Sequence, residues 1–226
     1  MYKKLEKKIG IKFKDYDLLR NAFVHRSYLN EHKNAEFEHN ERLEFLGDAV
    51  LELIVTEYLY LNFPNPEGDL TNWRSALVKG EMLAKVSRQL NLGEYLYLSH
   101  GEEKSGGREK DYLLANTFEA LIGVIYLELG YKKAKKFIDK FLLVYLDEIL
   151  ETGSHIDAKS KLQEIAQEKV GVTPDYRLLQ EEGPDHDKMF TMGAYIGERM
   201  VGKGIGGSKQ IAEQKAAEDA LKRLKW

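Results

Sequence analysis

The chain has 226 residues, 43% of them hydrophobic, so it is long enough to bury a core in one or two domains. Cysteine is absent, which excludes structural disulfides and thiolate zinc sites and suits a reducing compartment. No run of about 18 apolar residues could span a membrane, and no N-terminal stretch resembles a signal peptide, so we expect a cytoplasmic protein with no membrane partner. The net charge of −3 argues against a general polyanion binder, so any nucleic-acid surface must be a local patch.

A short helix is the first element predicted along the chain. Asp15 or Asp17 is placed to cap it, and the apolar residues that follow as far as Phe23 share one face. His25 comes directly after this helix, where a single histidine is more often structural than catalytic.

A helix rich in leucine and acidic residues is predicted from residue 39 to about residue 61. At about 100° per residue, Glu41, Glu44 and Asp48 fall within roughly 60° of arc, and apolar side chains cover much of the remaining circumference. Carboxylates on a helix packed on several sides are costly to bury unpaired, and a divalent cation with oxygen ligands would offset their repulsion. A solvated acidic face, which Glu52 would extend, is the alternative that the spacing leaves open.

A clear break follows the acidic helix. Two prolines and a glycine lie within residues 63–69, and Glu67 is part of this break. A second helical stretch is predicted over residues 70–90. Residues 101–107, which carry three glycines among charged side chains, indicate a mobile loop.

Another apolar helix is predicted over residues 112–126, with Asn116 and Glu119 one turn apart. A polar pair in this setting suggests a binding function, and a polar seam in a helical bundle or dimer explains it equally well. An amphipathic helix is predicted to follow over residues 132–151.

The periodicity changes after a short polar linker at residues 152–157. This part is predicted to contain a helix over 159–169, strands over 174–180, 188–196 and 198–202, and a final helix that opens at 204–210 and reaches Leu224. The order α-β-β-β-α predicts a separate small α+β domain. Its segment from Lys203 to Trp226 carries six Lys or Arg against three acids, which makes it the candidate for a local basic patch.

Two sets of motifs resemble known families. The segment Glu41-Arg-Leu-Glu-Phe-Leu-Gly-Asp-Ala49 resembles the signature of bacterial ribonuclease III. The tail resembles a double-stranded RNA-binding domain, with Gly183-Pro-Asp-His186 and Gly207-Ser-Lys209 in the expected places. Because the resemblance covers essentially the whole chain, it implies an all-α endonuclease domain that dimerises, over residues 1–151, joined to a small α+β double-stranded RNA-binding domain over residues 158–226.

The resemblance implies a Mg²⁺-dependent endoribonuclease, with Mn²⁺ as a substitute ion, that hydrolyses both strands of double-stranded RNA. Its products would have short 3′ overhangs and 5′ phosphates, and its roles would be rRNA and mRNA processing. The residues it assigns are the metal ligands and catalytic residues Glu44, Asp48, Asn116 and Glu119, and the further catalytic acids Glu41 and Glu67. Carboxylates suit this reaction because the cation they hold lowers the pKa of the attacking water and stabilises a poor leaving oxygen.

Asn116 departs from the family, which has aspartate at this position. The amide keeps an oxygen that could coordinate a metal, but it removes one negative charge and replaces one lone-pair face with an NH₂ donor. We therefore expect weak or absent cleavage, with folding and RNA binding intact. Whether the asparagine is natural or introduced is open from sequence.

The tail is expected to recognise the shape of A-form RNA, because such domains contact 2′-hydroxyls and phosphates across about 16 base pairs. Gln163 and Gln167 would contact one minor groove and His186 a second, while Lys209 and Lys215 would meet phosphates, Lys209 from a helix N-terminus. Each of these residues could instead be a solvated surface group. DNA, which lacks the 2′-hydroxyl, should bind poorly.

Phe45 and the overall function each have an alternative. Phe45 matches a family position that packs into the partner subunit of a homodimer, and an ordinary core position is equally open from sequence. The alternative function is that of a non-cleaving, dimeric double-stranded RNA-binding protein whose helical domain is a scaffold.

Overall fold

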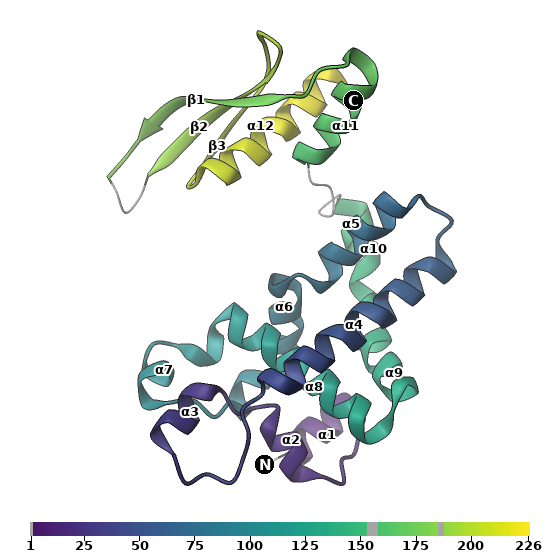
Figure 1. Ribbon diagram of the computed structural model, residues 1–226, viewed down its shortest axis with the longest axis vertical. Helices are drawn as coiled ribbons and strands as arrows, with labels where there is room; N and C mark the ends of the chain where they lie inside the picture. Colours follow the sequence, from purple (N-terminus) through teal and green to yellow (C-terminus); the bar gives the residue numbers. More distant parts are fainter. Residues whose placement is uncertain (1, 153–157, 185–187) are drawn as a thin grey trace. The chain divides into compact units, whose positions relative to one another are not determined.

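The computed structural model describes residues 2–152, 158–184 and 188–226 (Figure 1). The chain divides into two compact units, Met1–His155 and Ile156–Trp226. Most of the predicted linker at residues 152–157 lies outside the described residues, and so does His186.

The first unit is built from helices. Its longer helices are α4 (Glu41–Asn62), α5 (Glu67–Val78), α6 (Gly80–Leu90), α8 (Asp111–Leu129) and α9 (Tyr131–Phe141). Its shorter elements are α1 (Lys3–Ile9), α2 (Tyr16–Asn21), α3 (Arg26–Glu31), α7 (His100–Lys104), α10 (Leu146–Thr152) and the 3₁₀ turns η1 (Leu92–Tyr95), η2 (Gly107–Glu109) and η3 (Leu143–Tyr145). The prediction of an all-α domain is confirmed in the described residues, where an isolated bridge between Val24 and Tyr97 is the one β contact of this unit.

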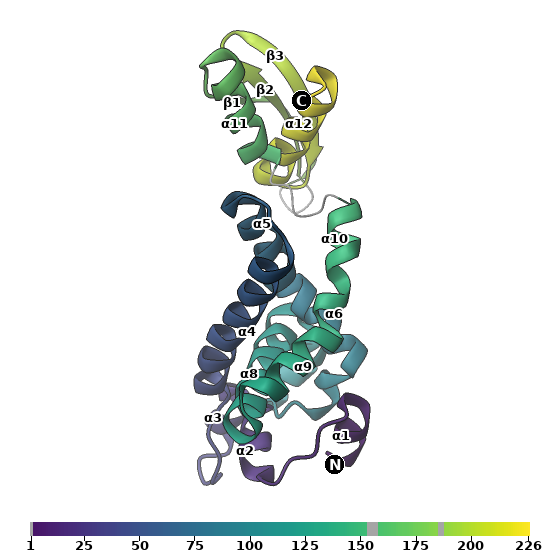
Figure 2. The same cartoon turned by 90° about the vertical axis from the view of Figure 1, so that its right-hand side faces the viewer.

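The core of this unit surrounds α8, in which eleven residues are buried. α4 packs along α8 more extensively than any other helix does, and α6 and α9 cover further sides (Figure 1 and Figure 2). Among the described helices, α8 is the one long and apolar enough to cross a membrane, but most of it is buried in the unit. Its apolar character is therefore that of a core helix.

The start of α2 agrees with the prediction, and a further short helix, α3, follows it. Asp15 caps α2, since its carboxylate accepts hydrogen bonds from the backbone N–H groups of Asp17 (3.0 Å) and Leu18 (2.9 Å). His25 caps α3, where its Nδ1 lies 2.8 Å from the hydroxyl of Ser27. The structural role predicted for this histidine is therefore supported.

Two segments that were each predicted as one helix are interrupted in the structure. The stretch over residues 70–90 is two helices, because Lys79 has an extended backbone (φ −63°, ψ 144°) between α5 and α6. The change of direction lets α6 pack against α8, where a Cβ on Gly80 would lie 3.9 Å from that of Ala115. The helix predicted over residues 132–151 likewise breaks after Phe141, at the 3₁₀ turn η3.

The loop predicted to be mobile at residues 101–107 overlaps α7 and the start of η2. The hydroxyl of Ser99 caps α7 by accepting a hydrogen bond from the backbone N–H of Glu102 (3.2 Å). Lys110 then donates to the Glu102 carboxylate at 2.6 Å, and Arg108 donates to the carbonyl oxygen of Gly93 at 2.8 Å. These side-chain contacts, which the glycine content hides, give the segment a defined structure.

The second unit has the predicted order of helix, three strands and helix. Its elements are α11 (Ala158–Val170), β1 (Asp175–Glu182), β2 (Met189–Ile196), β3 (Arg199–Gly206) and α12 (Lys209–Leu224). The strands form an antiparallel sheet in the order β1-β2-β3, and α12 packs on β2 and β3 and against α11 (Figure 2). Small and aliphatic residues such as Leu162, Val201 and Ala216 form its core. The predicted α+β fold is confirmed.

β3 extends further than predicted. The strand pairs with β2 as far as Gly206, opposite Phe190, whereas the sequence suggested that the helix opens near residue 204. Alternate glycines explain the extension, because a Cβ on Gly202 or Gly204 would lie 2.2 Å from a carbonyl oxygen of α12. Ser208, whose hydroxyl accepts from the N–H of Ile211, marks the true helix start.

Candidate metal centre and nucleic-acid interface

Two glycines let α4 and α8 cross with their backbones in contact. A Cβ on Gly47 would lie 1.8 Å from the carbonyl oxygen of Glu119, and a Cβ on Gly123 would lie 2.4 Å from that of Leu43. Such an approach is open only to residues without a Cβ. The acidic residues on either side of Gly47 therefore lie against the turns of α8 that precede Gly123.

The crossing gathers four side chains that the sequence predicted as metal ligands, named here the α4–α8 cluster: Glu44 and Asp48 from α4, and Asn116 and Glu119 from α8. The Glu119 carboxylate interacts electrostatically with both Asp48 and Glu44. The side-chain amide of Asn116 lies close enough to Glu44 to lower the pKa of that carboxyl. Acidic groups about 70 residues apart in sequence thus share one place, and their functional roles stay predictions.

Burial and like charge act together in the cluster. Asp48 is exposed, whereas Glu44, Asn116 and Glu119 are half-buried. Burial, followed by the charges of Asp48 and Glu44, raises the pKa of Glu119 to about 8. Burial, then Glu41, also raises the pKa of Glu44, and the Asn116 amide opposes that rise. The cluster is therefore a place where negative charge is unfavourable unless a cation is close.

The donor set of the cluster fits a hard divalent cation. Three carboxylates and one amide provide only oxygen ligands, which Mg²⁺ prefers. In residues 2–152, 158–184 and 188–226, no set of three histidine, aspartate or glutamate side chains lies close enough together to hold a metal ion in the present side-chain conformations. The fourth member of the cluster, Asn116, is an amide. The helix crossing brings the four groups to one place, where three of them interact electrostatically.

Glu41 lies at the edge of the cluster in a more neutral setting. Its carboxylate forms an ion pair with Arg26 at 3.2 Å and lies 3.8 Å from Nδ1 of His39. The charge of Glu41 also reaches His25, whose pKa burial lowers. Sequence reasoning missed these basic neighbours, because the loop before α4 gives no local signal of where it folds back.

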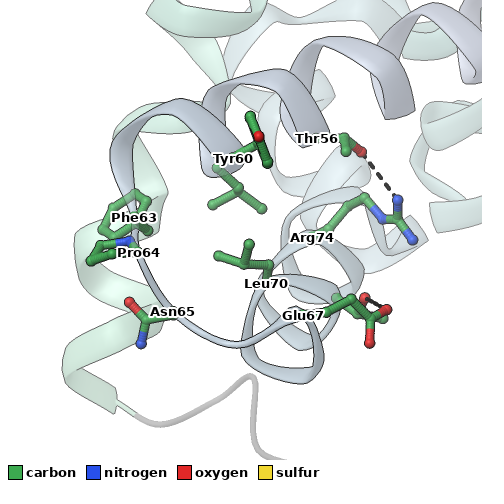
Figure 3. Close-up of a pocket in the computed structure, with 10 residues that line it drawn as sticks. Thr56, Tyr60, Phe63, Pro64, Asn65, Glu67, Leu70 and Arg74 are labelled. Atoms are coloured by element: carbon green, nitrogen blue, oxygen red, sulfur yellow. Dashed lines mark hydrogen bonds between the residues drawn. The ribbon is translucent and has the colours of Figure 1, made fainter.

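Glu67 lies away from the cluster. It begins α5, beyond the far end of α4, and its carboxylate accepts a hydrogen bond from the hydroxyl of Thr71 at 3.0 Å. The fourteen residues of α4 beyond Asp48 span about 21 Å, so one protomer does not bring Glu67 to the same ion. Glu67 instead lines a cavity of about 610 Å³ between the end of α4 and α5, together with Tyr60, Phe63, Leu70 and Arg74 (Figure 3).

Phe45 is not a core residue. Its side chain is 79% exposed, although it stands between two half-buried residues of α4. Leu53 and Tyr60, which are 58% and 76% exposed, lie within about 80° of arc from it on the same helix. α4 therefore carries an exposed apolar stripe beside its acidic stripe.

The residues predicted to contact RNA in the second unit lie on its surface. Gln163 and Gln167 are exposed on α11, and Lys215 is exposed on α12. Lys209 is exposed at the first residue of α12, with its Nζ 5.8 Å from the ring centre of Phe190. His186 lies outside the described residues, so its predicted contact stays a prediction.

Comparison with known proteins identifies both units. Residues 15–146 match the family model described as Ribonuclease-III-like, and residues 158–224 match the double-stranded RNA binding motif. The chain belongs to the ribonuclease III family. It is 48% identical over 222 residues to Ribonuclease 3 of Enterococcus faecalis, a match that covers 97% of this chain and 96% of that protein. It is 44% identical over 217 residues to Ribonuclease 3 of Borreliella burgdorferi, covering 96% and 88% respectively.

Solved structures agree with this assignment. The nuclease domain of ribonuclease III from Campylobacter jejuni is 43% identical, with a TM-score of 0.58, and the match covers 62% of this chain and 95% of that one. This member of the ribonuclease III family is accordingly an endonuclease of double-stranded RNA, and its second unit binds the duplex. Enzymes of the family use a divalent metal ion.

Proposed function

We propose that the α4–α8 cluster binds Mg²⁺, or Mn²⁺ in its place, and that the enzyme cuts both strands to leave short 3′ overhangs and 5′ phosphates. The observation that carries this proposal is the meeting of half-buried carboxylates from two helices at the Gly47–Gly123 crossing. Such a cation, when bound, supplies Lewis-acid activation of water and charge stabilisation at the leaving oxygen. Ribosomal and messenger RNA processing in the cytoplasm is the setting we predict.

The side chains of this site have different proposed roles. Asp48, the exposed member of the cluster, faces solvent and the incoming phosphate, while Glu44 and Glu119 are held in place by the helix crossing. Half-burial keeps bulk water away and strengthens every charge interaction in the site. Glu41, whose charge Arg26 balances, is proposed to orient water or a ligand at the edge of the site.

Asn116 is proposed to weaken catalysis in this chain. Its amide lies beside Glu44, where it would offer a bound cation a neutral oxygen in place of a carboxylate, and its NH₂ is a hydrogen-bond donor. The site then has one negative charge fewer to offset a divalent cation. We expect lower affinity for Mg²⁺ and slow cleavage.

Homodimer formation through α4 is proposed from its exposed apolar stripe. A two-fold axis that crosses α4 near Leu53 would pair the helix antiparallel with its copy, because the same patch must serve both subunits. Phe45 of one protomer would then lie opposite the partner's cavity at Tyr60 and Phe63, which is large enough to take an aromatic ring. The pairing would cover the apolar side chains that a single protomer exposes.

The same pairing gives Glu67 a function. Because Glu67 lies near the far end of α4 from Asp48, we propose that it serves the partner's cluster. The antiparallel arrangement brings the end of each α4 toward the beginning of the other, so Glu67 would approach the partner's Asp48. We propose that each site is completed by an acid from the other subunit.

The second unit is proposed to bind duplex RNA through Gln163 and Gln167 at a minor groove, and through Lys209 and Lys215 at phosphates. His186 is proposed to contact a second minor groove. Duplex DNA is expected to bind poorly, because it lacks the 2′-hydroxyls that the glutamines would contact.

A non-cleaving, dimeric RNA-binding protein is the second candidate function, and Asn116 is the observation that favours it. Calorimetric titration of Mg²⁺ into the full chain, with and without duplex RNA, separates the two. We expect one saturable binding event that Glu119→Gln abolishes. Glu52→Gln, which removes a half-buried carboxylate of α4 paired with Arg74, should leave the binding unchanged. Absence of specific binding in both conditions would favour the scaffold and reject the metal centre.

A further inference from the structure

A lysine-rich surface covers part of the first unit outside the α4–α8 cluster and the proposed dimer contact. Residues 1–14 and 131–141 together carry eleven lysines and two acidic residues, in a chain whose net charge is −3. The lysines of these two segments are named here the lysine face. All of them are exposed except Lys135, which is half-buried.

The two segments lie side by side. A Cβ on Gly10, at the end of α1, would lie 4.0 Å from Nζ of Lys140, near the end of α9. The backbone N–H of Lys14 donates a hydrogen bond to the carboxylate of Glu128, close to the start of α9. Residues 10–14 therefore lie beside α9. Lys3, Lys7 and Lys12 line one hollow with Gly10, so they share a surface with Lys140, whereas Lys8 donates a hydrogen bond to Asn91.

Most of this positive charge is not neutralised by the protein. In the described parts of the chain, Lys135 is the one lysine of the face with a carboxylate within 4.0 Å, that of Glu57 at 3.2 Å. Lys132, Lys136 and Lys140 repeat every four residues, so they rise about 6 Å apart on one side of α9. Like charges at this spacing disfavour a helix, and a bound anion would relieve them.

The lysine face is on a different side of α4 from the α4–α8 cluster. Glu57 points toward α9, since its carboxylate accepts a hydrogen bond from the hydroxyl of Tyr131 at 2.7 Å and pairs with Lys135. Nine residues separate Glu57 from Asp48, which is about 180° around a helix. The anion that this face would hold is therefore not the phosphate at the cleavage site.

We propose that the lysine face binds the phosphate backbone of a second stretch of RNA, so that a long structured RNA contacts the nuclease unit at two places. The proposal rests on the proposed nuclease function, which supplies the RNA. Binding at a second place raises the overall affinity through effective concentration, without new specificity.

The chemistry of the face favours RNA over a membrane surface. Membrane-surface helices insert exposed apolar side chains beside their lysines. Here the apolar residues of both helices point inward: Leu5 and Ile9 of α1 and Phe137 and Ile138 of α9 are buried. Every exposed residue of α1 and α9 is a lysine, which suits phosphates along a polyanion.

Binding of two RNAs to the full-length protein tests the proposal. The variant Lys3→Gln/Lys7→Gln/Lys132→Gln/Lys136→Gln is compared with the unmodified chain on a long, branched RNA and on a duplex of about 20 base pairs, little longer than one RNA-binding domain covers. We expect affinity for the long RNA to fall about tenfold or more at near-physiological salt.

The salt dependence of binding is the second measurement. The slope of log K against log salt should fall in magnitude by about 0.9 for each phosphate that the variant no longer neutralises. Affinity for the short duplex should stay within about twofold.

Matched variants keep these results interpretable. Lys132→Gln/Lys136→Gln should produce part of the loss, whereas Lys79→Gln/Lys85→Gln, which removes the same charge from lysines paired with Glu81 and Glu148, should produce none. Equal losses from both double variants would mean that net charge alone acts, and would overturn the proposal.

Two further outcomes are decisive. If the four-lysine variant binds the long RNA as the unmodified chain does but loses binding to phosphatidylserine-containing vesicles, the face is a lipid surface and the RNA proposal is wrong. If the unmodified chain fails to bind even the short duplex, the proposed function fails, and the present proposal fails with it. Normal binding of the short duplex with unchanged binding of the long RNA rejects the lysine face alone.

Discussion

In each unit, glycines let two backbones approach closely, but the side chains gathered at the two contacts differ in kind. In the first unit, Gly47 and Gly123 let α4 and α8 touch, and the side chains gathered there are carboxylates. In the second unit, Gly202 and Gly204 let β3 touch α12, and the side chains gathered there are alanines such as Ala216 and Ala220. The same close approach concentrates charge in one unit and only fills a core in the other.

The two units therefore differ in how far their proposed sites depend on tertiary structure. The α4–α8 cluster needs two helices to meet, whereas the surface proposed to bind RNA in the second unit needs little beyond each helix itself. The α4–α8 cluster tolerates like charges in a half-buried place, so that the pKa of Glu119 rises to about 8, which is unfavourable for folding but favourable for binding a cation. The side chains proposed to bind RNA in the second unit, where the structure describes them, are exposed, and each depends mainly on its own helix. Changes in the first unit should therefore be strongly coupled, and changes in the second should be nearly additive.

Restoring a carboxylate to the cluster should have the largest effect. Asn116→Asp adds the missing negative charge. Loss of a residue that only supports a metal ligand changes activity by about 10–100-fold. A change at a proposed metal ligand should have a larger effect, so we expect cleavage to rise about 100-fold or more. Gel assays on a long RNA duplex with Mg²⁺ measure this. Asn62→Asp, at the exposed end of α4, should leave the rate unchanged. Equal rates for the Asn116→Asp variant and the unmodified chain would show that the metal assignment of this position is wrong.

Filling the α4–α8 contact should disturb both folding and metal binding. Gly47→Ala would place a Cβ 1.8 Å from a backbone oxygen, so we expect the free energy of unfolding to fall by about 1–3 kcal/mol and Mg²⁺ affinity to fall with it. Gly68→Ala, in the first turn of α5, is the control, because nothing lies within 4 Å of a Cβ there and alanine is no worse a helix former than glycine. Urea unfolding and calorimetry provide the two measurements.

Filling the β3–α12 contact should have a comparable effect on folding but none on the metal. Gly204→Ala would place a Cβ 2.2 Å from the carbonyl oxygen of Ala212, so the second unit should lose about 1–3 kcal/mol of stability, and RNA binding should weaken. Mg²⁺ titration without RNA should match that of the unmodified chain. A loss of Mg²⁺ binding would contradict the independence of the two sites.

The charge at Glu119 should make stability depend on pH when a chelator removes divalent ions. Because the folded-state pKa of Glu119 is raised from 4.5 to about 8, this group favours folding fully below pH 4.5 and loses that contribution as the pH rises through 8. We expect roughly 1–2 kcal/mol of stability to be lost over this range, allowing for solvent screening. Glu119→Gln should flatten this part of the profile in urea unfolding. An unchanged slope would mean that another group is responsible.

The smallest effect is expected from single phosphate contacts in the second unit. Lys209→Gln should weaken binding of duplex RNA several-fold and lower the salt slope by about 1, with no change in Mg²⁺ binding. The effect should add to that of Lys215→Gln. Strong coupling between the two would show that this surface is not a set of independent contacts.

Much of the fold could be predicted from the local periodicity of apolar residues along the chain. The acidic helix, the Asp15 cap and the order of three strands between two helices follow from spacing and turn residues, and the structure has them. The breaks at Lys79 and after Phe141, and the extension of β3 to Gly206, could not be predicted in this way. Each depends on what packs across the backbone, which residue spacing along one segment does not contain.

The sequence by itself determined the two-domain order and which residue types could hold a cation or meet a phosphate. Helix periodicity is local, so it could place Glu44 and Asp48 on one face of α4. Only the tertiary structure decided that Glu119, about 70 residues later, meets them, that Phe45 is exposed, and that Glu67 lies beyond reach. The physical reason is that partners across a helix crossing are set by how closely two backbones approach, and here glycines without side chains set that distance.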